Sequence, residues 1–118
     1  MAAFDIFALS SCYEGHPYTF IEALSIGLPI VTTAIGGAKM SVLNNVNGFV
    51  SPIGDAKAMA ANLVKLANSP RLREEMSRAS FRIASDFSLE NMMRRTSEVY
   101  EGTIQTRSCL AQAAGTGR

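Results

Sequence analysis

The sequence predicts an α/β fold, in which about three short parallel strands come first and helices follow them. Three observations support this prediction. Apolar and β-branched runs alternate with a short helical pattern in the first half of the chain. The second half shows helical periodicity with capping residues at its boundaries. The composition, with 47% hydrophobic residues and few aromatic ones, is ordinary for a globular α/β protein of 118 residues.

The first three elements are expected to form one βαβ unit. A buried strand at about residues 5–9 leads into a loop, and a short helix at about 18–26 is closed by Gly27-Leu28-Pro29. Residues 29–33 are β-branched and bounded by proline and glycine, which is typical of a second buried strand. Because a helix connects the two strands through short links, they form one βαβ unit and should be parallel.

The third strand is expected at Phe49–Ser51. A glycine turn at Gly36-Gly37, a short apolar piece around residues 40–43 and an asparagine-rich turn separate it from the second strand. No helix precedes the first strand in this sequence, although parallel sheets are covered by helices on both faces. We therefore expect the chain to be a fragment, the C-terminal part of a longer domain.

Two helices are expected directly after the third strand. Asp55 is placed to cap a helix that runs to about residue 68. Ser69 is placed to cap the next helix, with Pro70 at its first position, and this helix should run to about residue 85. The charged residues of the second helix are expected to form a solvated face.

A last helix is expected from Ser88, its cap, through roughly Tyr100 or Ile104. Its buried stripe is expected to comprise Leu89, Met92, Met93, Thr96, Val99 and Tyr100. The residues from 102 to 118 are small and polar, and we expect them to form a disordered tail. Residues 1–101 would then be the folded, partial domain.

Composition also excludes several classes of protein. Eleven basic and ten acidic side chains give a net charge of +1, which does not indicate a nucleic-acid partner. No apolar run approaches the roughly 20 residues that span a bilayer, and no signal peptide is evident. The two cysteines, Cys12 and Cys109, lie far apart and form no metal-binding spacing. These features favour a soluble, cytoplasmic protein.

A pair of glutamates, Glu14 and Glu22, is the most informative motif. Seven residues separate them, and they straddle the predicted junction of strand, loop and helix. The free N–H groups at a helix start attract phosphate, and carboxylates are acceptors suited to vicinal hydroxyls. The combination favours a nucleotide-sugar ligand. Taken singly, Glu14 could instead be a helix-start carboxylate without a ligand, and Glu22 a solvated helix residue.

An ordered series of sequence blocks surrounds this pair. The blocks are Phe4–Ser11, Tyr13–Pro17, Ile21–Leu24, Gly27–Thr33, Gly36-Gly37, Asn47–Val50, Pro52, Asp55, Ala58–Ala60, Phe87–Glu90 and Tyr100. In this order they resemble the group-1 retaining glycosyltransferases of the GT-B fold, over about residues 4–101. In that family they form the C-terminal half of the Rossmann-like domain that binds the nucleotide-sugar.

The resemblance implies donor-binding roles for seven positions: Glu14, Gly15, His16, Pro17, Tyr18, Thr19 and Glu22. Glu14 matches the catalytic-site glutamate that accepts hydrogen bonds from hydroxyls of the donor sugar. Residues 15–17 match the loop that lies against that sugar. The backbone N–H groups of Tyr18 and Thr19 match those that face the diphosphate, and Glu22 matches the glutamate that holds the ribose hydroxyls.

The activity implied is transfer of a sugar from a nucleoside-diphosphate-sugar to an acceptor hydroxyl, with retention of configuration, in a process such as polysaccharide biosynthesis. The donor is a substrate, and neither a cofactor nor a metal is expected. The family's basic phosphate ligands and its N-terminal acceptor domain lie upstream of the first block. Because positioning and electrostatic stabilisation dominate such transfers, we expect this chain alone to be inactive.

One departure from the family pattern leaves an alternative open. Three positions after Gly37 the family often has an acidic residue, and this sequence has Met40. The alternative is a non-catalytic domain that binds a nucleotide-sugar or is purely structural. A flavodoxin-like regulator is a third interpretation, but it would need an acidic cluster at the strand ends. Only Asp5 stands in a suitable strand, and it precedes the body of that strand.

Overall fold

The computed structural model describes the backbone of residues 3–115 and the side chains of residues 3–106. The chain divides into two compact units, residues 1–86 and residues 87–118. The first unit contains β1 (Phe7–Leu9), α1 (Tyr18–Ser25), β2 (Ile30–Thr33), α2 (Ala38–Ser41), β3 (Gly48–Ser51), α3 (Ala56–Ala67) and α4 (Pro70–Ala84). A short 3₁₀ turn, η1 (Ser85–Phe87), precedes α5 (Leu89–Gly115).

The three strands form one parallel sheet in the order β1-β2-β3. Phe7 lies opposite Ile30 across the first strand pair, and Ile30 lies opposite Gly48 across the second. All four residues of the central strand, β2, are buried, as expected for a parallel strand that is covered on both faces. The predicted α/β class and the three-stranded parallel sheet are therefore confirmed.

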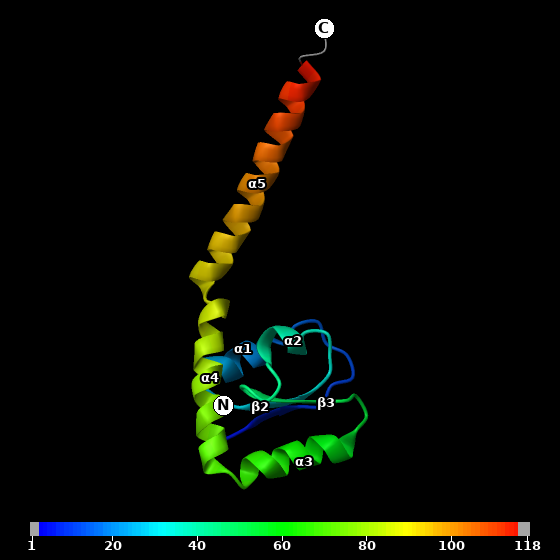
Figure 1. Ribbon diagram of the computed structural model, residues 1–118, viewed down its shortest axis with the longest axis vertical. Coiled ribbons are helices and arrows are strands. Elements are labelled where there is room, and N and C mark those ends of the chain that lie inside the picture. The colour runs from blue at the N-terminus through cyan, green and yellow to red at the C-terminus, as the bar shows by residue number, and fades with distance from the viewer. Residues whose placement is uncertain (1–2, 116–118) are drawn as a thin grey trace. The chain divides into compact units, whose positions relative to one another are not determined.

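Helices cover both faces of the sheet. Figure 1 shows α3 below the sheet and α1 with α2 above it. The helix α4 contacts both α1 and α3. The core on the α3 side consists of Val31, Phe49, Leu66 and Met76. On the α1 side, Phe20 and Leu24 are fully buried, and the Phe20 ring packs edge-on against Phe7 with centroids 6.2 Å apart.

The expected helix starts are present. Asp55 accepts a hydrogen bond from the N–H of Ala58 at 2.9 Å and caps α3. Ser69 accepts from the N–H of Leu72 at 3.3 Å and caps α4, with Pro70 at its first position. Because these caps satisfy helix N–H groups that lack intrahelical partners, each stabilises its helix by about 1 kcal/mol.

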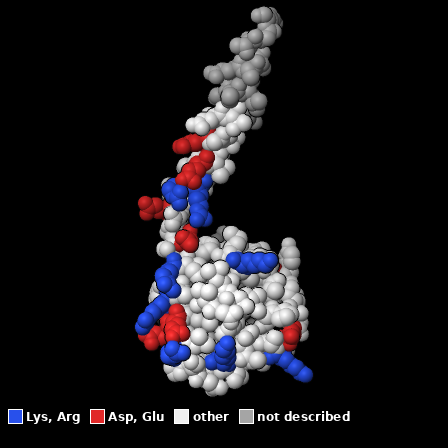
Figure 2. Space-filling view, in the orientation of Figure 1, with Lys and Arg blue, Asp and Glu red and all other residues white. Residues whose placement is uncertain are grey.

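The solvated face predicted for α4 is present except at Arg73, which is half-buried and donates to the carbonyls of Leu66 and Ala67. Other charged side chains of α4 form ion pairs one helical turn apart, Arg71 with Glu75 at 3.1 Å and Arg78 with Glu74 at 2.5 Å. Figure 2 shows charged side chains gathered along α4, whereas the middle of the visible face of the first unit is largely uncharged. These exposed pairs contribute little to stability, and they leave the helix charges balanced locally.

The second unit differs from the sequence-based expectation. Ser88 accepts from the N–H of Asn91 at 3.2 Å, as a cap should. The predicted helix end near Tyr100 or Ile104 is wrong, because α5 continues to Gly115 and includes most of the segment expected to be disordered. Residues 102–115 include three alanines, two glutamines, one leucine and one arginine, which favour helix, and a single internal glycine costs only about 1 kcal/mol. Residues 116–118 lie outside the described residues.

The stripe predicted to be buried on α5 is exposed in the structure. Five of its apolar side chains are between 57% and 69% exposed: Leu89, Met92, Met93, Val99 and Tyr100. Helical periodicity identifies an apolar face, but it does not supply a partner for that face. The domain division at residue 101 stays a prediction.

Candidate functional site

The glutamate loop, residues 10–17, connects the carboxyl end of β1 to the start of α1. Glu14 lies on this loop and is half-buried, and Glu22 is the fifth residue of α1 and is exposed. The stretch is strand, loop and helix, as the sequence predicts. In open α/β sheets, ligands bind outside the carboxyl ends of the strands, so the loop occupies the ligand-binding edge.

A hydrogen-bonded chain ties the glutamate loop to the sheet. The hydroxyl of Thr33, the last residue of β2, donates to the carbonyl of Ser11 at 2.5 Å. The hydroxyl of Ser11 donates in turn to Oε1 of Glu14 at 3.1 Å. Thr33 is only 5% exposed. The carboxylate of Glu14 is therefore connected to the rigid end of a neighbouring strand through two hydrogen bonds.

The glycine turn after β2 packs directly against the backbone of this loop. A Cβ atom at Gly37 would lie 1.9 Å from the carbonyl oxygen of Gly15 and 2.7 Å from the Cα of His16. The backbone angles of Gly37 are ordinary, with φ of −77°, so the requirement for glycine is purely steric. The Gly36-Gly37 block thus shapes the site by supporting the loop, a role that the sequence analysis missed.

The side chain of His16 is hydrogen-bonded to Ser41, the last residue of α2. Its Nε2 lies 2.7 Å from the hydroxyl of Ser41, which is fully buried. The side-chain amide of Asn47, also fully buried, donates to the Ser41 carbonyl at 2.9 Å and accepts from the N–H of Leu43 at 2.7 Å. The sequence analysis did not single out Ser41 and gave the asparagine-rich turn no role beyond connecting two elements. Asn47 instead organises the segment that holds His16.

The start of α1 differs from the starts of α3 and α4. Its N-cap is Pro17, and within the described chain it has neither a side-chain cap nor an acidic residue in its first turn. The N–H of Phe20 bonds to the Pro17 carbonyl at 3.0 Å, while the N–H groups of Tyr18 and Thr19 precede it in the first turn. The Tyr18 side chain is 81% exposed. An uncapped helix start of this kind suits an anion.

A small cavity of about 170 Å³ lies beside the glutamate loop, on the α3 side of the sheet edge. Ser10, Cys12 and Thr33 line it together with residues 54–56 and Met59 at the start of α3. Neither Glu14 nor Glu22 contributes to its lining. The cavity therefore borders the candidate site but does not contain the two carboxylates.

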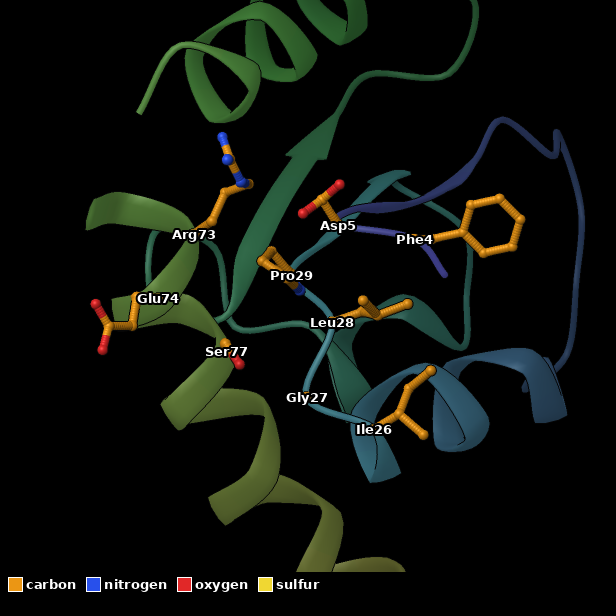
Figure 3. A pocket seen from close by; sticks show the side chains of 9 residues that line it. All are labelled: Phe4, Asp5, Ile26, Gly27, Leu28, Pro29, Arg73, Glu74 and Ser77. Carbon is orange, nitrogen blue, oxygen red and sulfur yellow. The ribbon is translucent and has the colours of Figure 1, made fainter. Parts of the chain in front are cut away.

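A second cavity, of about 260 Å³, lies at the opposite end of the strands (Figure 3). Asp5, residues 26–29 before β2, and Arg73 of α4 contribute to its lining. Arg73 points toward α3 in Figure 3 and donates to the carbonyls of Leu66 and Ala67 at 2.7 and 2.8 Å. Its charge stabilises the C-terminal end of α3, so this cavity does not present a free cation to a ligand.

The described residues contain no group of three or more His, Cys, Asp or Glu side chains placed to hold a metal ion. No helix among them combines the length and the apolar character needed to cross a bilayer.

The sequence profile of the family described as "Glycosyl transferases group 1" matches residues 1–82. The chain belongs to this family. The resemblance stated from the sequence blocks is therefore confirmed, and the strand, glutamate loop and α1 all fall within the matched residues.

Curated relatives agree with this assignment. The chain is 29% identical over 111 residues to the D-inositol 3-phosphate glycosyltransferase of Streptomyces griseus, covering 94% of this chain and 24% of that protein. It is 37% identical over 70 residues to the capsular polysaccharide biosynthesis glycosyltransferase CapM of Staphylococcus aureus. This match covers 59% of this chain and 18% of CapM. The chain thus spans about a quarter or less of the length of these two glycosyltransferases.

A solved structure shows the same fold. The sucrose-phosphate synthase of Thermosynechococcus elongatus matches with a TM-score of 0.80 and 22% identity, over 88% of this chain and 26% of that one. This likeness confirms the predicted Rossmann-like α/β fold. The roles of Glu14, Glu22 and the residues between them stay predictions.

Proposed function

We propose that this chain is the donor-binding part of a glycosyltransferase. The enzyme transfers a sugar from a nucleoside-diphosphate-sugar to an acceptor hydroxyl and retains the anomeric configuration. The observation that carries the proposal is the attachment of the Glu14 carboxylate to the sheet, at the carboxyl edge and next to the uncapped start of α1. Membership in group 1 of the glycosyl transferases supports it.

In this proposal Glu14 is the catalytic residue that contacts the donor sugar. Oε1 already accepts one hydrogen bond from Ser11, and the carboxylate has about four acceptor positions in all. The remaining positions accept from sugar hydroxyls, in charge-assisted bonds that are about twice as strong as neutral ones. Gly15, which has open space where a Cβ would stand, lets the sugar approach the backbone.

The rest of the donor lies along the start of α1. The N–H groups of Tyr18 and Thr19 face the diphosphate, since no side chain caps them and the helix dipole favours an anion there. Glu22, one turn into the helix and exposed, accepts from the ribose hydroxyls. His16 and Pro17 complete the wall against the sugar, with His16 oriented by Ser41.

The remainder of the enzyme supplies what this segment lacks. Residues 10–25 contain no lysine or arginine, so other parts of the protein must provide the cations that balance the diphosphate. They also provide the acceptor site, and the chain alone is inactive in this proposal. Neither a metal nor a cofactor takes part in the transfer. We place the enzyme in the cytoplasm, in polysaccharide biosynthesis, the process named for CapM.

The test uses the full-length protein that carries this chain. It is incubated with UDP- and GDP-sugars and with lipid and polysaccharide acceptors, and release of the nucleoside diphosphate is measured. Glu14→Ala should reduce transfer at least a hundredfold, whereas Glu75→Ala on the solvated face of α4 should leave it within twofold of wild type. The NMR coupling of the product's anomeric proton reports retention.

Three outcomes would contradict this proposal. Unchanged turnover in Glu14→Ala removes Glu14 from the site, and an inverted product excludes the retaining mechanism. Donor binding without transfer to any acceptor supports the non-catalytic alternative, which the replacement of an acidic residue by Met40 favours. Met40 is 64% exposed on α2.

A further inference from the structure

We infer that Ser11 and Thr33 are positioning residues, which orient the carboxylate of Glu14 toward the donor sugar. The inference rests on the proposed function, because it assumes that Glu14 contacts that sugar. Neither residue belongs to the donor-binding set expected from the sequence, and both are assigned from contacts within the glutamate loop and β2.

The first contact fixes the side chain of Glu14. A glutamate has three rotatable side-chain bonds, so an unrestrained carboxylate on a loop samples many orientations. The hydroxyl of Ser11, three residues earlier, donates to Oε1 at 3.1 Å. This bond holds one oxygen of the carboxylate in place, while Oε2 and the second lone pair of Oε1 are the acceptors for the ligand.

The second contact fixes Ser11 itself. The Thr33 hydroxyl donates to the Ser11 carbonyl at 2.5 Å, and Thr33 is almost fully buried at the end of the central strand. Thr33 lies opposite Ser51 of β3, and the next N–H, that of Ala34, bonds to the Ser51 carbonyl at 2.8 Å. The orientation of Glu14 is therefore set by a buried, hydrogen-bonded residue at the end of the central strand.

The third contact supports the loop from the side of the glycine turn. Gly37 packs against the backbone of Gly15 and His16 with no room for a methyl group. The loop is thus bonded to β2 through Ser11 and supported by the glycine turn beyond its tip. Sites of this precision matter because a displacement of about 1 Å can reduce the rate about a hundredfold.

A purely structural role for the Ser11 hydroxyl makes a different prediction from a positioning role. If the hydroxyl only shaped the loop, its loss would disturb residues 15–17 and the start of α1 together. Binding of a nucleoside diphosphate and of a nucleoside-diphosphate-sugar would then weaken equally. If it orients Glu14, only the sugar-dependent part of the affinity should fall.

The experiment measures both ligands by calorimetry on the full-length protein, using UDP with UDP-sugars and GDP with GDP-sugars. Ser11→Ala should weaken binding of the nucleotide-sugar about tenfold and leave the nucleoside diphosphate within twofold. It should lower kcat/KM for transfer by between about ten- and a hundredfold. Ser11→Thr, which keeps the hydroxyl, should recover most of both losses, and Thr33→Val should show the same selectivity as Ser11→Ala.

Matched controls remove hydroxyls that donate to backbone carbonyls, as that of Thr33 does, but lie far along the chain from the glutamate loop. These are Ser85→Ala, whose hydroxyl donates to Arg82, and Thr96→Val, whose hydroxyl donates to Met92. Both should leave the two affinities and the turnover unchanged. Thermal melts of every variant identify any that fails to fold. If Ser11→Ala does so, Thr33→Val compared with Thr33→Ser decides the question.

The outcomes separate this inference from the proposed function. If the wild-type protein binds no nucleotide-sugar, both are overturned. If Glu14→Ala abolishes transfer but Ser11→Ala and Thr33→Val retain full affinity and turnover, only the positioning role is overturned. An equal loss of affinity for the nucleoside diphosphate and its sugar conjugate also overturns it, in favour of loop structure alone.

Discussion

Replacing Gly37 by alanine gives the sharpest test of how the site is built. The new Cβ would stand 1.9 Å from the Gly15 carbonyl oxygen, whereas an ordinary contact lies at 3.4 Å or more. The atoms that the new Cβ would meet, the Gly15 carbonyl oxygen and the His16 Cα, belong to the backbone. The loop must therefore move by more than 1 Å. Overpacking of this kind costs about 1–3 kcal/mol, and the movement carries Glu14 with it. We expect transfer to fall about a hundredfold, beyond the effect on stability.

The assay pairs urea denaturation with donor binding and turnover of the full-length protein. Gly36→Ala is the matched control, because its Cβ would meet the Glu14 carbonyl oxygen at 3.7 Å, an ordinary contact. The reasoning is wrong if the two alanine variants have the same stability and the same affinity for donor. It is also wrong if Gly37→Ala loses stability but keeps full turnover, since the loop would then tolerate the displacement.

Two further predictions concern stability and are measured by urea denaturation. Asn47→Ala leaves the Leu43 N–H and the Ser41 carbonyl without their buried partner, so the free energy of unfolding should fall by about 2–4 kcal/mol. Asn44→Ala, which removes one exposed bond to the Val50 N–H, should cost less than about 1 kcal/mol, and equal losses would contradict the argument from burial. Ser69→Ala removes the cap of α4 and should cost about 1 kcal/mol, so an unchanged midpoint would show that the cap is dispensable.

Features set by local chemistry could be predicted from the sequence. Asp55, Ser69 and Ser88 were predicted as caps because a short polar side chain bonds to an N–H three residues later, whatever the rest of the fold does. The parallel strand pair followed from the short links of one βαβ unit. For each cap, the polar side chain and the N–H that it bonds lie three residues apart. The paired strands are farther apart in the chain, but the helix between them is itself a signal in the sequence.

Long-range contacts of the site could not be predicted in this way. Thr33 and Ser11 are 22 residues apart, and His16 and Ser41 are 25 apart. No periodicity or turn signal links such pairs, since folding alone brings them together. The adjacent glycines at 36 and 37 were a usable signal of close backbone approach, but the sequence does not show which backbone approaches.

The length of α5 illustrates the opposite error. Gly102 and the small residues after it were interpreted as the onset of disorder, although an internal glycine weakens a helix by only about 1 kcal/mol. The helix continues through it to Gly115. Small and polar composition therefore lowers the expectation of a packed core without excluding secondary structure, and the two should be predicted separately.

The arrangement around Glu14 also brings together in space blocks that are separate in the sequence. The block at residues 13–17 carries the carboxylate, but Thr33, at the end of the block that forms β2, fixes its orientation. The glycine block at 36–37 holds the same loop from the next turn. Each block alone is a weak signal, since serines, threonines and glycines at strand ends are common. In this structure they act together, because the loop that carries the Glu14 carboxylate contacts both Thr33 and Gly37.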